Sequence, residues 1–312
     1  MSKILVTGGA GFIGQNLVSK LSEQNEIIIF DNGFRGSFSK SNNNKIEFIN
    51  GDITKISDWE QIPSDVDSIF HLGAINGTKY FYEIPEKVLD VNIKGVQNLL
   101  EFSRKRDIEE VLFTSSSEVY GYPKIFPTPE TEELSIPDVY NPRFSYSSSK
   151  IIGEILCVNF TRKYNLKHTI VRYHNIYGPN MGHEHVMPQF INKLIKNEEF
   201  FVEGDGTETR SFCFIDDAID ATLLVNKDNS FKNRIFNIGN DVETSIIDLI
   251  DLLSRISGKV IEPKFRVKNN AGTKRRVPDI SKARSIGYSP KITLNDGFKI
   301  TYDWYSKYYK EN

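Results

Sequence analysis

The sequence predicts an α/β protein with a Rossmann-type, doubly wound parallel sheet and a smaller mixed α/β lobe at the C-terminal end. Three observations predict it. Short apolar strands alternate with helix-length segments, a glycine-rich turn joins the first strand to the first helix, and the elements become shorter after about Tyr173. We therefore expect residues 1–173 to form the first domain, to which later segments return, and residues 174–312 to form mainly the second lobe.

The predicted sheet takes six strands from the first half of the chain. Each is a short apolar run bounded by polar or turn residues, which suits a strand buried on both faces. These segments are Lys3–Thr7, Ile27–Asp31, Ile46–Asn50, Ser68–Leu72, Val111–Ser115 and His168–Arg172.

Helical apolar spacing predicts the connecting segments of the first half and most of the second half. Helices of crossover length are expected at Phe12–Glu23, Val88–Arg104 and Ser147–Tyr164. In the second half we expect helices at Met187–Lys196, Ser245–Ser257 and Tyr302–Tyr309.

The composition is that of an ordinary globular protein. Among 312 residues, 39 Lys and Arg nearly balance 41 Asp and Glu, so we expect neither a nucleic-acid partner nor a membrane surface. Cys157 and Cys213 are too few for a disulfide framework and lack metal-ligand spacing. We therefore expect a cytoplasmic protein with no membrane span and no structural metal.

The glycine turn has the spacing of a dinucleotide site. Gly8, Gly11 and Gly14 follow a strand and open a helix, and Asp31 ends the next strand, where a carboxylate binds ribose hydroxyls and repels a 2′-phosphate. This favours NAD, although Arg35 leaves NADP open. The alternative is that Asp31 only starts a turn. From this part of the chain, we expect Gly8, Gly11, Phe12, Ile13, Gly14, Asp31, Asn32, Asp52 and Ile53 to contact the cofactor.

Tyr146 and Lys150 stand four residues apart at the start of a predicted helix, so their side chains share one face. The ammonium, together with an oxidised nicotinamide, would lower the pKa of the phenol and allow it to take a proton from a substrate hydroxyl. Tyr120 and Lys124 have the same spacing. A glycine and a proline between them make a helix improbable there.

The segment Thr114–Gly121 follows the fifth strand and so lies at the carboxyl edge of the sheet, where open α/β folds bind ligands. A serine hydroxyl there would bond the same substrate oxygen as Tyr146. The alternative is that these serines only cap backbone groups.

Together these motifs resemble the extended short-chain dehydrogenase/reductases, specifically the NAD-dependent nucleotide-sugar epimerase/dehydratase group. The resemblance rests on Gly8–Gly14, Asp31, His71–Ala74, Ser115–Gly121, Tyr146, Lys150 and Arg172–Pro179. It implies a catalytic set of Ser116, Tyr146 and Lys150, of which Tyr146 and Lys150 also contact the cofactor. Further cofactor contacts are implied at Leu72, Gly73, Ala74, Asn92 and Tyr173. It also implies a nucleotide-sugar substrate, C4 oxidation by tightly bound NAD, and a homodimer built from the helices near Val88–Arg104 and Ser147–Tyr164.

The reaction that follows C4 oxidation depends on Glu118, which stands where dehydratases of this family carry a base for the C5 proton. We expect a 4,6-dehydratase in which Ser117 and Glu118 also belong to the catalytic set. Ser117 departs from the Asp-Glu pair of one dehydratase group, and Glu118 would otherwise only bond a neighbouring group. The open alternatives are a 4-epimerase, a UDP-glucuronate decarboxylase, an NADP-dependent carbonyl reductase and a non-catalytic NAD-binding protein.

Polar and cationic residues of the second half suit the substrate diphosphate and sugar. The resemblance implies substrate contacts at Asn175, His185, Arg210, Arg275 and Arg276, although each arginine alone could be a surface charge. The adjacent His183 and His185 lack a distant partner, so we expect no zinc site.

Overall fold

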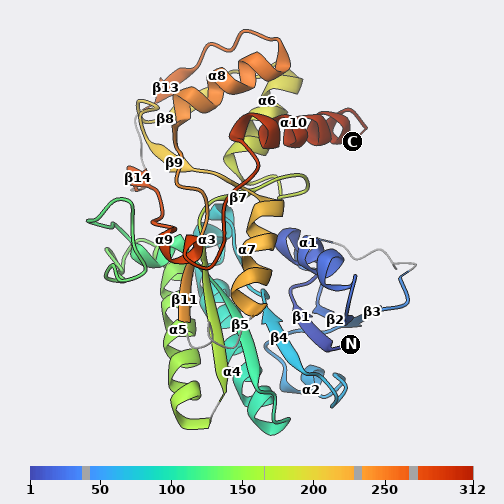
Figure 1. Ribbon diagram of the computed structural model, residues 1–312. Helices are drawn as coiled ribbons and strands as arrows, with labels where there is room; N and C mark the ends of the chain where they lie inside the picture. Colours follow the sequence, from blue (N-terminus) through green and yellow to red (C-terminus); the bar gives the residue numbers. More distant parts are fainter. Residues whose placement is uncertain (37–42, 165, 228–233, 267–272, 312) are drawn as a thin grey trace. The chain divides into compact units, whose positions relative to one another are not determined.

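The computed structural model describes residues 1–36, 43–164, 166–227, 234–266 and 273–311. The chain divides into two compact units (Figure 1). The first comprises Met1–Gly121, Glu133–Arg172 and Ile219–Phe236. The second comprises Tyr122–Glu132, Tyr173–Ala218 and Asn237–Asn312. That the first unit binds the cofactor and the second the substrate stays a prediction.

A seven-stranded sheet confirms the predicted Rossmann-type fold. The strands, in spatial order, are β11 (Arg234–Ile238), β6 (Lys167–Tyr173), β5 (Glu110–Ser116), β4 (Ser68–His71), β1 (Lys3–Thr7), β2 (Glu26–Asp31) and β3 (Ile46–Asn50). Every neighbouring pair from β3 to β5 is parallel. The order reverses next to β1, which is the point where doubly wound sheets bind their ligands.

The helices of the first unit cover this sheet. They are α1 (Phe12–Leu21), α2 (Ile56–Trp59), α3 (Thr78–Glu83), α4 (Pro85–Lys105) and α5 (Phe144–Tyr164), with a 3-10 turn η1 at Ser117–Tyr120. Helices α4 and α5 run side by side (Figure 1). Leu99 and Leu100 of α4 pack with strand residues such as Leu5, Ile69 and Val111 in one apolar core. This burial fixes the helices on the sheet.

The second unit consists of short strands and three longer helices. Its strands are β7 (Ile176–Tyr177), β8 (Phe201–Glu203), β9 (Thr209–Ser211), β10 (Cys213–Phe214), β12 (Glu243–Ser245), β13 (Lys264–Arg266) and β14 (Arg275–Arg276). Its helices are α6 (Val186–Lys196), α8 (Ile246–Ser257), α9 (Ser281–Arg284) and α10 (Leu294–Glu311). Helix α7 (Ile215–Lys227) contributes to both units. Along the ranges that the structure describes, no helix is both long and apolar enough to cross a membrane.

Candidate active site

The turn between β1 and α1 has no room for side chains at two of its glycines. Gly8 has a φ of +72°, and a Cβ on it would lie 2.6 Å from the nitrogen of Gly73. A Cβ on Gly14 would lie 2.3 Å from the carbonyl oxygen of Gly8, whereas one on Gly11 meets that oxygen at 3.3 Å. Gly11 caps α1 through its backbone alone. The start of α1 therefore offers bare N–H groups, which fits the pyrophosphate of NAD.

Asp31 fastens this turn to the end of β2. Its carboxylate accepts hydrogen bonds from the N–H groups of Gly33 at 2.8 Å and Ala10 at 3.0 Å. Burial raises the pKa of Asp31, and these two N–H groups oppose that shift. Arg35, which left NADP open, donates to the carbonyl oxygen of Asn76. A carboxylate next to the glycine turn matches the predicted contact with adenosine ribose hydroxyls.

The segment after β4 lies against the same turn. The N–H of Leu72 donates to the carbonyl of Thr7 at 3.0 Å, and that of Gly73 donates to the Thr7 hydroxyl at 3.2 Å. The structure thus brings together two of the predicted cofactor segments, the glycine turn after β1 and the segment after β4. The other predicted cofactor residues between β1 and β4 differ in exposure. Phe12 and Ile13 at the start of α1 and Ala74 after β4 are half-buried, and Asn32 is exposed. The Asp52 carboxylate accepts a hydrogen bond from the N–H of Thr54, and Ile53 is buried in the core.

The side-chain oxygen and nitrogen of Asn92 both form hydrogen bonds within the protein. Its oxygen accepts from the N–H of Ile75 at 2.8 Å. Its nitrogen donates to the carbonyl of Ile75 at 3.2 Å and to the Ser149 hydroxyl at 3.0 Å. This side chain therefore ties α4 to α5, and its contact with the cofactor stays a prediction. Tyr173 is buried at the end of β6.

Tyr146 is buried in α5, and the Ser116 hydroxyl at the end of β5 is one of the groups that act on its phenol. Burial raises the pKa of Tyr146 strongly, Ser116 lowers it, and Glu118 and Arg35 act in opposite directions. We expected a net lowering from Lys150 and an oxidised nicotinamide. In the chain itself burial outweighs the lowering by Ser116 and Arg35, because Tyr146 is only 6% exposed, and Lys150 is not among the groups that shift this pKa.

Lys150 lies next to this phenol on the same face of α5. Its Nζ is 5.7 Å from the centroid of the Tyr146 ring and donates to the carbonyl of Thr114 at 2.8 Å. Burial lowers the pKa of Lys150 to about 8. The group is therefore mainly an ammonium at neutral pH, although it is close to losing its proton.

Glu118 is held by an arginine that the sequence analysis did not single out. Nη2 of Arg143 donates to Oε1 of Glu118 at 3.2 Å, and the two side chains are 18% and 19% exposed. The N–H of Glu118 donates to the Ser116 hydroxyl at 3.2 Å, so Ser116 caps η1. Ser117 is buried between them. The ion pair favours the ionised carboxylate, the form that a base needs.

The rejected pair Tyr120 and Lys124 is not on a helix. Tyr120 ends η1, and its phenol accepts a hydrogen bond from Arg172 at 2.9 Å. Lys124 lies in an irregular segment of the second unit. The prediction that this pair lacks the catalytic geometry is therefore supported by the backbone.

Two other contacts of the site were missed. The ring of Phe81 in α3 stacks on Tyr146, and Glu154 forms a buried ion pair with Arg172. Nothing in the sequence distinguishes Phe81 from any other apolar residue in a short segment. Glu154 and Arg172 could have been predicted to pair, because a charged residue on the buried face of a helix or inside an apolar strand needs a buried partner.

The second unit brings two of the predicted substrate arginines into register. Strands β9 and β14 are parallel, and Arg276 is the register partner of Arg210. Nη2 of Arg210 donates to the carbonyl of Thr273 at 2.7 Å. Arg275 instead pairs with Glu243 at 2.7 Å. Register partners point to the same face, so Arg210 and Arg276 share one face of this small sheet.

The remaining predicted substrate residues also lie in the second unit. Asn175 has a φ of 44°, and its side-chain nitrogen donates to the carbonyl of Ser211 at 2.9 Å. His185 is the half-buried residue that precedes α6. Outside the five short gaps in the description, no group of three or more His, Cys, Asp or Glu side chains is placed to hold a metal.

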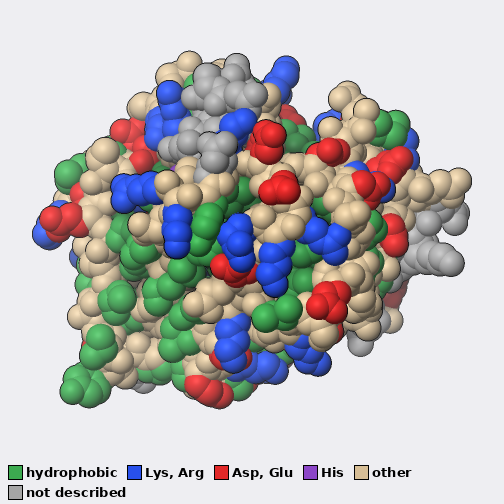
Figure 2. All heavy atoms as spheres, turned by 90° about the horizontal axis from the view of Figure 1, so that it is seen from below, with side chains coloured by type: hydrophobic (Ala, Val, Ile, Leu, Met, Phe, Trp, Pro, Cys, Tyr) green, Lys and Arg blue, Asp and Glu red, His purple; other side chains and the backbone are tan. Residues whose placement is uncertain are grey.

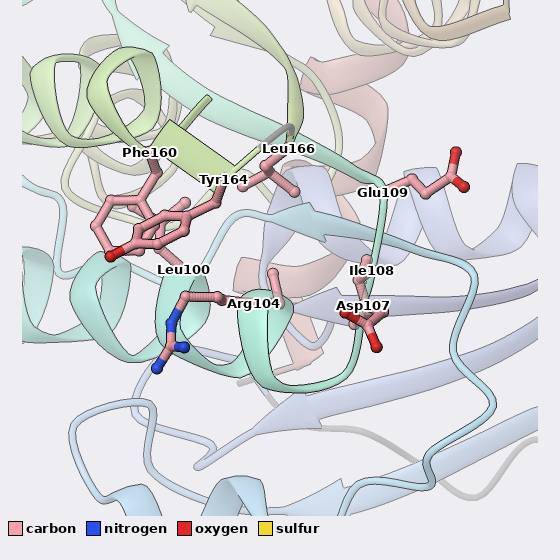
Figure 3. Close-up of a pocket in the computed structure, with 9 residues that line it drawn as sticks. Leu100, Arg104, Asp107, Ile108, Glu109, Phe160, Tyr164 and Leu166 are labelled. Atoms are coloured by element: carbon pink, nitrogen blue, oxygen red, sulfur yellow. The ribbon is translucent and has the colours of Figure 1, made fainter. Parts of the chain in front are cut away.

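A hollow of about 390 Å³ lies at the far end of the first unit (Figure 3). The Arg104 guanidinium, near the C-terminal end of α4, lies 5.5 Å from the centroid of the Tyr164 ring, near the end of α5. The other lining residues are Leu100, Ser103, Asp107, Ile108, Glu109, Phe160 and Leu166. Residues 107–109 precede β5, whereas Ser116 ends it. The hollow is therefore at the amino edge of the sheet, away from the predicted catalytic set.

Comparison with known proteins gives a consistent picture. Residues 4–239 match the model of the "NAD dependent epimerase/dehydratase family". A putative UDP-glucose 4-epimerase of Methanocaldococcus jannaschii is 37% identical over 96% of this chain and 97% of its own length. UDP-glucuronic acid decarboxylase 3 of Arabidopsis thaliana is 34% identical over 96% and 87%. The structure of the dTDP-glucose 4,6-dehydratase DesIV of Streptomyces venezuelae, with NAD and TYD bound, matches with a TM-score of 0.89, 25% identity and coverage of 98% and 97%.

Proposed function

Because this chain belongs to the NAD-dependent epimerase/dehydratase family, we propose that it oxidises C4 of a nucleotide sugar with Ser116, Tyr146 and Lys150 as its catalytic residues. NAD as the cofactor follows from the family and fits the glycine turn beside Asp31. The observation that carries the proposal is the position of the Lys150 Nζ, 5.7 Å from the centroid of the Tyr146 ring, with the Ser116 hydroxyl lowering the pKa of the same phenol. The family includes epimerases and dehydratases, so the outcome of the reaction needs an argument of its own.

The first step needs a base at the C4 hydroxyl. When bound, NAD supplies an acceptor for the C4 hydride and later returns it to the sugar. Tyr146, in its phenolate form, takes the hydroxyl proton, and the Lys150 ammonium stabilises that phenolate. Ser116 donates to the same sugar oxygen and holds it at the phenol. The product of this step is a 4-keto sugar.

Glu118 supports a 4,6-dehydratase as the lead reaction. A 4-ketone acidifies the proton on C5, and the carboxylate that Arg143 holds is available to take it. The C5–H electrons then form the C5–C6 double bond as the C6 hydroxyl departs. The proton on Glu118 passes to that hydroxyl, so water leaves.

A nucleotide-uronate decarboxylase is the second candidate, because Arg143 is a guanidinium next to the same position. A C6 carboxylate would find a cationic partner there. The similarity to UDP-glucuronic acid decarboxylase 3 favours this candidate as well. In that reaction the C5–C6 bond of the 4-keto sugar breaks, CO2 leaves, the bond electrons form the enolate of the 4-ketone, and C5 then takes a proton from the solvent. Glu118 would then not be needed as a base.

The substrate diphosphate belongs with the arginines of the second unit. Arg210 and Arg276 share a face of the β9–β14 pair, and guanidinium groups bind phosphate with two parallel hydrogen bonds. Arg275 is already paired with Glu243. We therefore assign the diphosphate to Arg210 and Arg276 and leave Arg275 outside the site.

A homodimer through α4 and α5 also remains part of the proposal. Ile152 and Ile155 of α5 are 37% and 54% exposed. Two large apolar side chains exposed on one helix face are typical of a surface that a partner covers. Figure 2, which views the molecule from below, shows hydrophobic side chains reaching the surface on its left side. Light scattering at micromolar concentration checks this and contradicts it if the protein is a monomer. A cytoplasmic location suits the two free, buried cysteines.

One experiment distinguishes the reactions. The enzyme is incubated in D2O with UDP-, GDP-, dTDP- and CDP-sugars, including uronates, and products are analysed by mass spectrometry and NMR. Dehydration removes the mass of water and places deuterium on C5. Decarboxylation removes CO2 and also leaves deuterium on C5, whereas epimerisation at C4 keeps the composition and leaves C5 without deuterium. A product that has not lost water contradicts the dehydratase. No turnover of any nucleotide sugar contradicts the whole proposal.

A further inference from the structure

The first unit contains a buried ion pair one helical turn beyond Lys150. Glu154 of α5 and Arg172 of β6 are 3% and 2% exposed. Nε of Arg172 donates to Oε1 of Glu154 at 2.9 Å, and Nη2 donates to Oε2 at 2.6 Å. Such a pair loses much of its attraction to desolvation, so it contributes little net stability compared with an apolar pair of the same volume. A role in geometry is the better explanation.

The pair holds both ends of the segment that carries Ser116 and Glu118. Just before the segment, the Ser115 hydroxyl donates to Oε1 of Glu154 at 2.5 Å. At its end, Nη1 of Arg172 donates to the Tyr120 phenol at 2.9 Å, and the guanidinium lies 4.9 Å from the ring centroid. Ser115 and Tyr120 are themselves buried. The turn between them is therefore fixed at two points to one ion pair.

The same pair belongs to the helix that carries the phenol and the ammonium. Tyr146, Lys150 and Glu154 follow one another at intervals of four residues along α5, so they share one face. Burial lowers the pKa of Lys150 to about 8, and the negative charge of Glu154 opposes that shift. Glu154 thus acts on Lys150 through its charge, and on the segment that carries Ser116 through its contacts with Ser115 and Arg172.

We propose that Glu154 and Arg172 are positioning residues that set the placement of the Ser116–Glu118 segment against the helix bearing Tyr146 and Lys150. This rests on the proposed function, in which those residues carry the chemistry. A two-point guanidinium–carboxylate contact fixes direction as well as distance, whereas apolar side chains pack without such direction. Small displacements of reacting groups cost on the order of 100-fold in rate.

The test combines a charge deletion with a volume-matched replacement. In Glu154→Gln the alkaline limb of kcat moves to lower pH, because Lys150 loses the charge that favours its ammonium. We expect kcat to fall by about 10- to 100-fold while KM is kept. The double variant E154L/R172M removes both charges and packs without an unpaired ion, so it folds, and thermal unfolding verifies this. Its kcat is low as well.

Two controls separate charge from position. Glu154→Asp keeps the negative charge, so its alkaline limb stays in place while kcat falls less than in Glu154→Gln. Glu101→Gln removes an exposed carboxylate that pairs with Arg104 on α4, and it changes neither kcat nor the pH profile.

The inference is overturned if the folded E154L/R172M variant keeps the wild-type kcat and alkaline limb. A fall in kcat that is equal at every pH in Glu154→Gln contradicts the action of its charge on Lys150. Failure of the proposed function is a different result, in which Tyr146→Phe keeps full activity. The inference alone fails when Tyr146→Phe is inactive and the Glu154 variants are not impaired.

Discussion

The ring of Phe81 lies almost parallel to that of Tyr146, with centroids 5.0 Å apart and 16° between the planes. Phe81 belongs to α3, a short helix that otherwise has no partner role in the predicted chemistry, and it is 4% exposed. The stacking closes the phenol off from water. This explains why burial dominates the pKa of Tyr146.

Replacement of this ring should loosen the phenol. In Phe81→Leu we expect the free energy of unfolding to fall by about 1 kcal/mol, the typical worth of an aromatic pair. Water that reaches Tyr146 brings its pKa down, so the acid limb of activity moves to lower pH. Phe34→Leu is the control, because the Phe34 ring contacts Tyr80 at a centroid distance of 5.3 Å and a tilt of 52° but is 41% exposed. Equal effects of both variants on the acid limb would contradict the role of Phe81.

Alanine at two glycines should separate folding from cofactor binding. In Gly14→Ala the new Cβ meets backbone at 2.3 Å, so thermal unfolding should occur at lower temperature. In Gly11→Ala the nearest atom is at 3.3 Å, so the fold is kept, but the added methyl group stands at the N-cap of α1, where the pyrophosphate is predicted to bind. We expect this variant to purify with much less NAD. Normal NAD content in a stable Gly11→Ala would argue against the predicted binding mode.

Burial of the charged Lys150 should lower the free energy of unfolding. Its pKa is about 8 in the folded protein against an ordinary value of 10.5, so between these pH values the unfolded chain binds more protons. Stability therefore rises with pH across this window, and the full cost of burial, about 3 kcal/mol, is present below it. In Lys150→Met we expect the free-energy cost of burying the charge to disappear, together with the rise of the unfolding free energy with pH. Loss of the hydrogen bond to Thr114 offsets part of this gain. Urea unfolding at several pH values would measure both effects. The exposed Lys163→Met is the control and should change neither the unfolding free energy at neutral pH nor its dependence on pH. An unchanged pH dependence of stability in Lys150→Met would show that Lys150 does not cause it.

Register in the second unit makes a prediction about substrate binding. In Arg276→Met we expect KM for the nucleotide sugar to rise about tenfold or more, because a charge-assisted contact to the diphosphate is lost. Arg275→Met should change KM little, since its partner is the half-exposed Glu243. Steady-state kinetics on the two variants checks this. A larger effect at Arg275 would show that the two arginines have been assigned the wrong way round.

Local patterns were sufficient for the first six strands of the sheet, because each is a short apolar run with its own turn signals. The seventh strand, Arg234–Ile238, was missed because a five-residue run in a mixed region carries no sign that it returns to the sheet. Helices α4 and α5 begin earlier than Val88 and Ser147, since their first turns lack the apolar period of their centres.

The positions of the proposed catalytic residues were predictable for a similar reason. Tyr146 and Lys150 are one turn apart on a helix, and Ser116 follows a strand, so local geometry fixes where they point. The contacts of Arg143 with Glu118 and of Arg172 with Glu154 join different elements. Only the packed chain reveals such pairs, although a charged residue in a buried position is a reason to look for them.

The central claim is that Tyr146 takes the C4 proton while hydride leaves the sugar. The most direct measurement mixes purified enzyme containing NAD with each nucleotide sugar and follows the absorbance of reduced nicotinamide in a stopped-flow instrument, in wild type and in Tyr146→Phe. We predict a transient rise in the wild type and a rate at least about 100-fold lower in the variant, with equal NAD content. An equal rise in both proteins would contradict the account.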